Sequence, residues 1–138
     1  MAAVTPDGVS VPIRTKDDIA QARRAAGRLM RELHFDRVTA ESVLLTVAEL
    51  GTNLLRYGTD GVLRIDQIPG ERGIGVRVES RDNGPGIADI ERALEDGFST
   101  GGGLGHGLPS VRRLMDRFDI STSPTGTTVT ACKWPAHR

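Results

Sequence analysis

Two polar residues on one predicted helix have types and a spacing suited to proton transfer and metal binding. Glu49 and Asn53 are four residues apart, so on a helix they lie one turn apart on the same face. Ser42 and Thr46 fall on the same arc, directly beside an apolar arc that predicts the core. A carboxylate can take a proton from an attacking hydroxyl, and an amide oxygen is a suitable neutral ligand for Mg²⁺. The alternative is a solvated helix edge, which is the usual meaning of a single glutamate on a helix.

A second carboxylate stands at the end of a predicted strand. Residues 74–80 alternate between apolar and polar and lead directly into Asp82-Asn83-Gly84-Pro85-Gly86. Such a strand delivers Asp82 to a turn with few side chains. There the carboxylate can accept a hydrogen bond from a ligand that the glycine backbone allows to approach closely. The same five residues are also typical of an ordinary tight turn.

A glycine run precedes a third predicted helix, which begins near Leu108. The run is Gly101-Gly102-Gly103-Leu104-Gly105-His106-Gly107. A loop that ends at a helix N-terminus presents free backbone N–H groups and the positive end of the helix dipole, which suit a polyphosphate. The run lacks the lysine of the Gly-Lys-Ser/Thr phosphate loop and does not follow a strand as a dinucleotide fingerprint should. A flexible surface linker is the alternative.

Helical periodicity predicts the two long helices that would position these groups. The first is capped by Thr15 and stops near His34, and the second is capped by Thr39 and ends about Tyr57-Gly58. Gly51, in the middle of the second helix, costs about 1 kcal/mol relative to alanine. Close packing against a neighbouring element would be a reason to tolerate it.

Alternating and turn-bounded segments complete the predicted fold. Strands are expected at 9–13, 62–66, 74–80, 118–122 and 127–133, and short helices at 87–94 and 108–115. Because Pro12 cannot donate to a ladder, the first strand is expected at a sheet edge. The sequence therefore predicts an α/β protein, an α+β sandwich in which helices pack on one face of a mixed, mostly antiparallel sheet. Residues 1–8 are expected to be a loose lead-in, and residues 9–138 a single domain.

Composition excludes several classes of protein. The 138 residues contain 18 basic and 18 acidic side chains, so the formal net charge is zero. A non-specific nucleic-acid or membrane-surface binder would need a basic excess. The single Cys132 excludes an intramolecular disulfide and a cysteine-rich metal site. No bilayer-spanning stretch or signal peptide is recognisable, and a cytoplasmic location is expected.

Taken in order, these features resemble the motifs of a known ATP-binding fold. Glu49 to Asn53 is similar to the N box, Asp82 to Ile87 to the G1 box, and Gly103 to Leu108 to the G2 box of the Bergerat-type fold of gyrase, Hsp90, histidine kinases and MutL. The segments 95–105, 107–109 and 113–116 resemble those of anti-sigma-factor serine/threonine kinases, and among them the stressosome switch kinases of the RsbT type. The ending 126–129 with Lys133-Trp134 fits as well, and the resemblance extends from about Val11 to Trp134.

The resemblance implies a Mg-ATP site. Asp82 would bind the adenine amino group, Asn53 would hold Mg²⁺, and Glu49 would be the general base towards a protein serine or threonine. Phe98 to Gly103 would be the ATP lid. The nucleotide-contacting residues that it implies, besides Asn53 and Asp82, are Gly84, Gly86, Ile87, Ser99, Thr100, Gly101, Gly102, Gly103, Leu104, Gly105, His106, Gly107, Leu108 and Thr128.

The resemblance also implies protein partners. Relatives phosphorylate STAS-domain antagonist and scaffold proteins, and a PP2C-type phosphatase or a sigma factor is a further expected partner. Some relatives carry an arginine just before the second glycine box, where this chain has Ser99 to Gly102, so Mg²⁺, backbone N–H groups and the helix dipole would have to stabilise the transition state. His106 replaces a small residue and either contacts phosphate when protonated or has no role. The alternative function is a binding module in which ATP only orders the lid.

Overall fold

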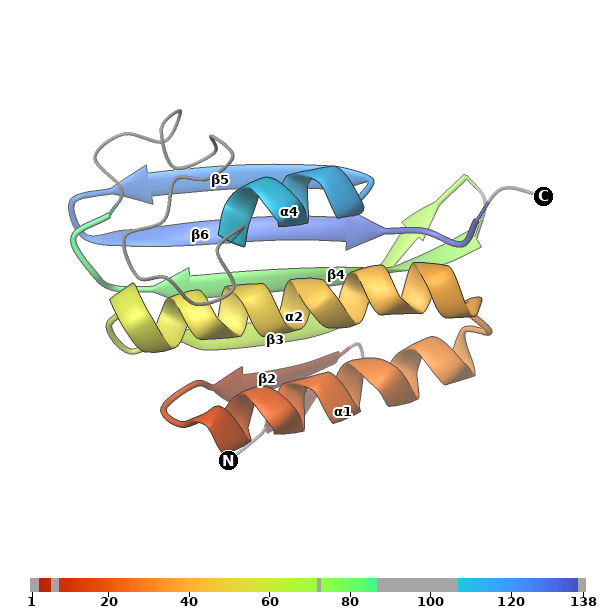
Figure 1. Cartoon of the computed structure of the whole chain (residues 1–138), viewed down its shortest axis with the longest axis horizontal. Helices are drawn as coiled ribbons and strands as arrows, with labels where there is room; N and C mark the ends of the chain where they lie inside the picture. The colour runs from red at the N-terminus through yellow and green to blue at the C-terminus, as the bar shows by residue number, and fades with distance from the viewer. Residues whose placement is uncertain (1–2, 6–7, 72, 87–106, 137–138) are drawn as a thin grey trace.

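The computed structural model describes residues 3–5, 8–71, 73–86 and 107–136. These residues form three helices and six strands (Figure 1). The elements are β1 (Ala3–Thr5), β2 (Gly8–Pro12), α1 (Lys16–Glu32), α2 (Arg37–Tyr57), β3 (Val62–Gly70), β4 (Gly73–Asp82), α4 (Gly107–Leu114), β5 (Arg117–Ser123) and β6 (Gly126–Lys133).

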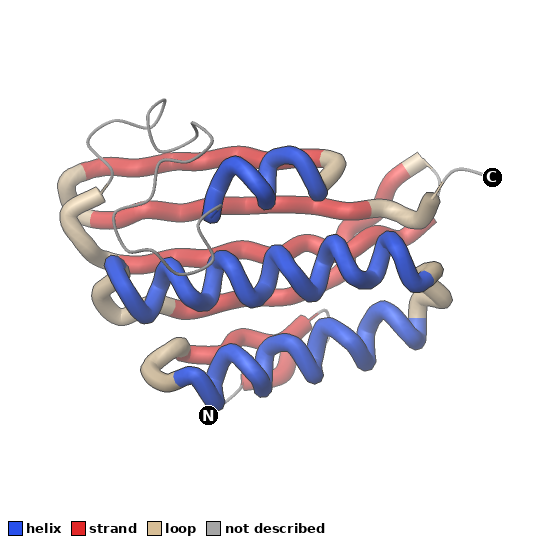
Figure 2. The backbone as a smooth tube through the Cα atoms, viewed as in Figure 1, coloured by secondary structure: helices blue, strands red, loops and turns tan. Residues whose placement is uncertain are grey.

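The strands form one sheet in the order β1-β2-β3-β4-β6-β5. All three helices lie on the same face of the sheet, with α2 between α1 and α4 (Figures 1 and 2). The predicted layer architecture is confirmed, with one correction: each neighbouring pair among the described strands is antiparallel, so the sheet is not mixed there. The predicted short helix at 87–94 lies outside the described residues. None of the described helices is long and apolar enough to cross a membrane.

The described part of the N-terminal segment contains a strand that the sequence did not predict. β1 pairs with β2, with Val4 opposite Val9, so the expected loose lead-in contains a strand. The prediction of β2 as an edge strand is therefore wrong for Gly8–Ser10. Pro12 lies beyond the described pairs of β1 with β2, so none of the pairs described there requires an N–H from it. Three residues carry too little periodicity to identify β1 in advance.

The two long helices begin differently. Thr15 caps α1 as predicted: its hydroxyl accepts from the Asp18 N–H (3.3 Å), while the Asp18 carboxylate accepts from the N–H groups of Arg14 (2.8 Å) and Thr15 (2.9 Å). These backbone hydrogen bonds lower the pKa of Asp18.

The predicted cap of α2 is wrong. Asp36 is the N-cap residue, and Thr39 lies buried in the first turn. The Asp36 carboxylate does not reach a helix N–H with hydrogen-bond geometry, but its proximity to the Thr39 hydroxyl lowers its pKa. Asp36 and Thr39 are both good capping residues, and a cap signal alone does not choose between them.

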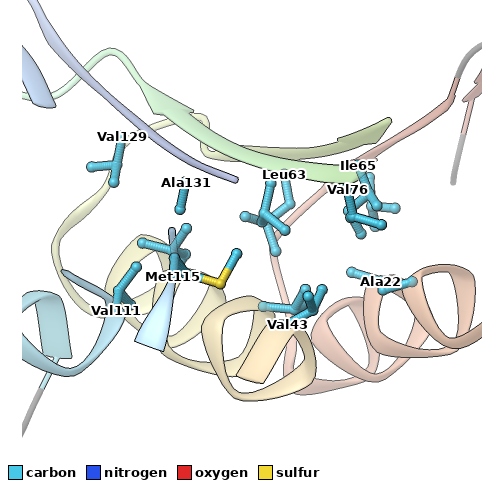
Figure 3. Close-up of a cluster of buried hydrophobic side chains, with 14 of the residues drawn as sticks. Ala22, Val43, Leu63, Ile65, Val76, Val111, Met115, Val129 and Ala131 are labelled. Carbon is cyan, nitrogen blue, oxygen red and sulfur yellow. The ribbon is translucent and has the colours of Figure 1, made fainter. Parts of the chain in front are cut away.

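The apolar arc of α2 forms the centre of the core (Figure 3). It consists of Val43, Val47, Leu50 and Leu54, all 5% exposed or less. The sheet opposite contributes Val11, Leu63, Ile65, Val76, Val78, Val129 and Ala131, and the flanking helices contribute Ala22, Ala26, Met30, Leu108 and Val111, with Met115 just beyond α4. This burial fixes α2 against the sheet, so the polar arc of the same helix is fixed as well.

Close packing explains the glycine in the middle of α2. A Cβ atom at Gly51 would lie 2.9 Å from Cγ1 and 3.2 Å from Cγ2 of Ile19 on α1. The two helices therefore approach each other through the missing side chain, as the sequence led us to expect. Gly27 on α1 is different, because its Cβ would meet only the guanidinium tip of Arg31 at 3.5 Å.

This difference gives a matched test. Gly51→Ala should lower the free energy of unfolding by about 1–3 kcal/mol, because the new methyl group overlaps Ile19. Gly27→Ala should instead raise it by about 1 kcal/mol through helix propensity alone. Urea denaturation of both variants measures the difference. In an Ile19→Ala background the penalty of Gly51→Ala should disappear, and a penalty that persists there would contradict the packing explanation.

Candidate functional site

Asp82 lies at the end of β4, where the sheet meets the C-terminal end of α2. Its Oδ1 accepts a hydrogen bond from the Gly84 N–H at 2.7 Å. This is the side-chain bond of an ordinary Asx turn, so the plain-turn interpretation holds for one oxygen. No hydrogen bond to Oδ2 comes from the described residues, and the side chain is half-buried. One carboxylate can therefore hold its own turn and still accept from a ligand.

The glycines on both sides of Pro85 make room for close contacts. A Cβ at Gly84 would lie 2.9 Å from Asp82 Oδ1. Gly86 has φ +86°, and a Cβ there would overlap the Ser123 carbonyl and come within 2.8 Å of Thr122 Oγ1. Gly86 thus lets the turn pack on the end of β5, which is a structural reason for the residue apart from any ligand.

The connection between α2 and β3 holds this turn in place, which the sequence did not indicate. The Asn83 N–H donates to the Thr59 carbonyl at 2.8 Å. A Cβ at Gly58 would lie 3.3 Å from Asp82 Cβ and 2.9 Å from the Leu54 carbonyl. Gly58 ends α2 as predicted, although its backbone is extended and not left-handed. Its small size lets the helix end lie directly against Asp82.

The polar arc of α2 faces α4, and only part of it is available for chemistry. Thr46 is fully buried and its hydroxyl donates to the Ser42 carbonyl at 2.9 Å, so it is satisfied within the helix. Ser42 donates to the Val38 carbonyl in the same way, at 3.4 Å. Glu49 is 4% exposed and Asn53 is half-buried. Burial of Glu49 excludes the solvated-edge interpretation.

The N-terminus of α4 lies opposite Asn53. A Cβ at Gly107 would lie 4.0 Å from the Asn53 side-chain nitrogen, and Gly107 has φ +41°. Pro109 is in the first turn, as predicted. The glycine run therefore ends beside the amide of α2. The N–H groups of the first α4 turn suit phosphate oxygens, and the Asn53 amide oxygen suits Mg²⁺, which keeps most of its own water and phosphate ligands.

Leu108 can make the predicted contact only through its backbone. Its side chain is 8% exposed and belongs to the core. Only its backbone N–H, at the start of α4, remains as a group that could meet a ligand. The other predicted nucleotide contacts of this region lie outside the described residues and stay predictions: Ile87, Ser99, Thr100, Gly101, Gly102, Gly103, Leu104, Gly105 and His106.

Strand register identifies Thr127, not Thr128, as the neighbour of Asp82. Thr127 is directly opposite Asp82, and Val129 is opposite the buried Ser80. Since side chains alternate along a strand, Thr127 lies on the helix-covered face and Thr128 on the opposite face, beside Arg81. Thr127 is buried, and its hydroxyl shares a 2.9 Å hydrogen bond with Thr122. The geometry thus favours Thr127 for the role predicted for Thr128.

Comparison with known proteins agrees with this architecture. Residues 14–133 match the histidine kinase-like ATPase domain family. The chain belongs to this family. It is 40% identical over 129 residues to the serine/threonine-protein kinase RsbT of Bacillus subtilis, covering 93% of this chain and 97% of the relative. The match places the chain among the serine/threonine kinases of the family and implies that ATP is its nucleotide.

A solved structure supports the fold. The crystal structure of the RsbU and RsbW domains of Rv1364c from Mycobacterium tuberculosis superimposes with a TM-score of 0.66 at 18% identity. The match covers 99% of this chain but 34% of the longer protein, and it concerns the fold alone.

The role of Asp82 can be tested without disturbing its turn. In Asp82→Asn the amide oxygen can still accept from the Gly84 N–H, but an adenine amino group loses a charged acceptor. ATP affinity measured by calorimetry should fall at least about tenfold, corresponding to about 1.4 kcal/mol, while the melting temperature changes little. Unchanged ATP affinity would remove Asp82 from the site.

Thr127 and Thr128 form a matched pair for the register argument. Thr127→Val keeps the shape of the side chain but removes a hydroxyl beside Asp82, and ATP affinity should decrease several-fold. Thr128→Val makes the same chemical change on the opposite face and should leave ATP affinity within about twofold of the parent. The reverse order of effects, measured in the same calorimetric assay, would restore the original prediction.

Proposed function

We propose that the chain transfers the γ-phosphoryl group of Mg-ATP to a serine or threonine of a STAS-domain protein, with Glu49 as general base. The burial of Glu49 on the α2 face that packs against α4, one turn from Asn53, carries the proposal. Carboxylates are seldom buried, and a buried carboxylate beside a candidate binding site is a candidate general base.

Each element has one task in the proposed reaction. Asp82, at the C-terminal end of α2, selects adenine. About 13 Å further towards the helix N-terminus, at 1.5 Å per residue, Glu49 lies near the phosphate end. Between them, Asn53 and the first N–H groups of α4 hold the metal and the phosphates. This order along one helix corresponds to the order of base and phosphates along the nucleotide.

The chemical step is an in-line transfer. Glu49 accepts the proton of the substrate hydroxyl as the hydroxyl oxygen bonds to the γ-phosphorus, and the bond from that phosphorus to the bridging oxygen breaks to release ADP. Bound Mg²⁺ would neutralise charge on the phosphate oxygens. The dipole and free N–H groups at the N-terminus of α4 add to this stabilisation, which matters because the lid sequence lacks an arginine at Ser99 to Gly102.

The proposed output is partner switching. The STAS substrate would be an antagonist or scaffold protein, and phosphorylation would free the kinase for a PP2C-type phosphatase or a sigma factor. The similarity to RsbT supports a regulatory protein of this kind. The second candidate is a binding module in which ATP orders the chain without transfer. The buried Glu49 supports the kinase, since transfer to a hydroxyl uses a general base.

Glu49→Gln separates the two candidates. The substitution keeps the size and hydrogen-bonding capacity of the side chain but removes its basicity, so phosphoryl transfer should fall by at least about 100-fold. Transfer of ³²P from ATP to a purified STAS protein is the measurement, and ATP affinity should stay within a few-fold. Glu41→Gln, an exposed change on the same helix, is the control.

Two results would contradict the proposal. Normal transfer by the Glu49→Gln variant would remove its role as base. Stable STAS binding by the parent chain without any phosphoprotein would favour the binding module.

A further inference from the structure

The outer surface of α1 and α2 carries exposed apolar and basic side chains that the proposed reaction does not use. Val38 is 75% exposed and Leu45 is 42% exposed, and they lie two turns apart on the outer face of α2. Arg24 and Arg31 have the same spacing on α1 and are exposed. We refer to these four residues, with Gly27, as the α1–α2 surface.

The two rows lie level with each other. Ile19 packs against Gly51, and the helices are antiparallel neighbours (Figure 1). Because the helices are antiparallel, a residue further along α1 lies beside a residue that comes correspondingly earlier in α2. Arg24 is therefore level with about Leu45, and Arg31 with about Val38. The surface thus carries two pairs, each of one arginine and one aliphatic side chain. The pairs are seven residues apart, about 10.5 Å along the helix axes.

The arginines on this surface have no partner within the described chain. The described ion pairs use other cations, namely Arg64, Arg77, Arg81, Arg117 and Lys133. Basic residues also outnumber acidic ones along the three described helices, although the whole chain has a net charge of zero. An exposed acidic residue, Glu41, lies between Val38 and Leu45 along α2. An acidic partner is therefore attracted to the α1 side of the surface.

Gly27 adds an independent observation. A glycine inside a helix costs about 1 kcal/mol relative to alanine. At Gly51 the chain needs it, because Ile19 occupies the space. At Gly27 the space for a side chain is open except for the tip of Arg31. Nothing within the described chain requires this glycine. The missing side chain leaves a low point in the helix surface between Arg24 and Arg31, where another backbone can approach closely.

We infer that the α1–α2 surface docks an acidic amphipathic helix of a partner protein. The helix presents two apolar residues seven apart to Val38 and Leu45, and Asp or Glu residues to Arg24 and Arg31. A basic or uncharged residue faces Glu41. A second copy of this chain is disfavoured because it would bring a second surface of the same positive charge. A nucleic acid would not cover the aliphatic side chains, and a flat lipid surface would not fill the low point at Gly27.

The inference goes beyond the proposed function and does not depend on phosphoryl transfer. The test therefore uses the full chain without ATP. The ¹⁵N-labelled chain is titrated with a synthetic helical peptide of about 18 residues that carries leucines seven apart and a row of glutamates. Amide shifts should cluster around Arg24 to Arg31 and Val38 to Leu45. A peptide with lysine in place of each glutamate should bind at least tenfold more weakly.

Variants locate the contact. The double substitution Arg24→Glu with Arg31→Glu, and separately Leu45→Glu, should each raise the dissociation constant at least tenfold. Arg112→Glu, the same charge change on α4, should alter it less than twofold. Gly27→Ala should weaken binding several-fold while raising the melting temperature by about 4 °C, a combination that a loss of folding cannot produce.

Several outcomes would overturn the inference. These are shifts confined to another surface, equal binding of the lysine peptide, and dissociation constants that the four substitutions leave unchanged. Preferential binding of a DNA duplex or of anionic phosphatidylserine vesicles, or concentration-dependent dimerisation through this surface, would assign it to another occupant. Each of these outcomes can occur whether or not Glu49→Gln abolishes phosphoryl transfer. Failure of the docking inference can therefore be distinguished from failure of the proposed function.

Discussion

The structure depends on the burial of the apolar arc of α2 against the sheet. Val43, Val47, Leu50 and Leu54 fix the rotation of this helix about its own axis. Every other face of α2 then has a defined neighbour: α1 through Gly51, α4 through the polar arc, and solvent through Leu45. Because a helix turns by about 100° per residue, a change of one position in the apolar arc would turn Glu49 away from α4. Hydrophobic packing therefore positions the polar group on which the proposed chemistry depends.

The Asp82 turn combines two interpretations that exclude each other on sequence alone. Asp-Asn-Gly-Pro-Gly is both an ordinary turn sequence and a ligand-binding motif. The structure assigns one carboxylate oxygen to the turn, through the Gly84 N–H, and leaves the other without a partner among the described residues. The internal hydrogen bond orients the carboxylate before any ligand arrives, so less ordering entropy is lost on binding. A turn that holds its own carboxylate in place is thus a suitable scaffold for recognising the adenine base of a nucleotide.

Sequence periodicity was sufficient where a pattern extended over many residues. It identified α1, α2 and the five longer strands, and the i, i+4 spacing placed Glu49 and Asn53 on one face. It failed where the decision rested on one or two residues. Asp36 and Thr39 are equivalent cap candidates, and β1 is too short to show a period. Thr127 and Thr128 are chemically identical, and only the pairing of β4 with β6 distinguishes their faces. The connection that holds the Asp82 turn, through the Thr59 carbonyl, involves backbone atoms and has no signal in side-chain types.

Net charge illustrates the same limit. A formal charge of zero argues against a non-specific polyanion binder, and that argument holds for the whole chain. The net charge does not indicate how positive and negative side chains are distributed over the folded surface. The sheet face without helices pairs its charges internally: Arg77 binds Asp66 with two hydrogen bonds of 2.9 and 2.6 Å, and Arg64 lies 3.5 Å from the same carboxylate. On the helix face, Arg24 and Arg31 have no such pair with any residue that the structure describes. A chain of zero formal charge therefore presents an excess of basic residues along its described helices, on the side of the sheet that also carries Glu49 and Asn53.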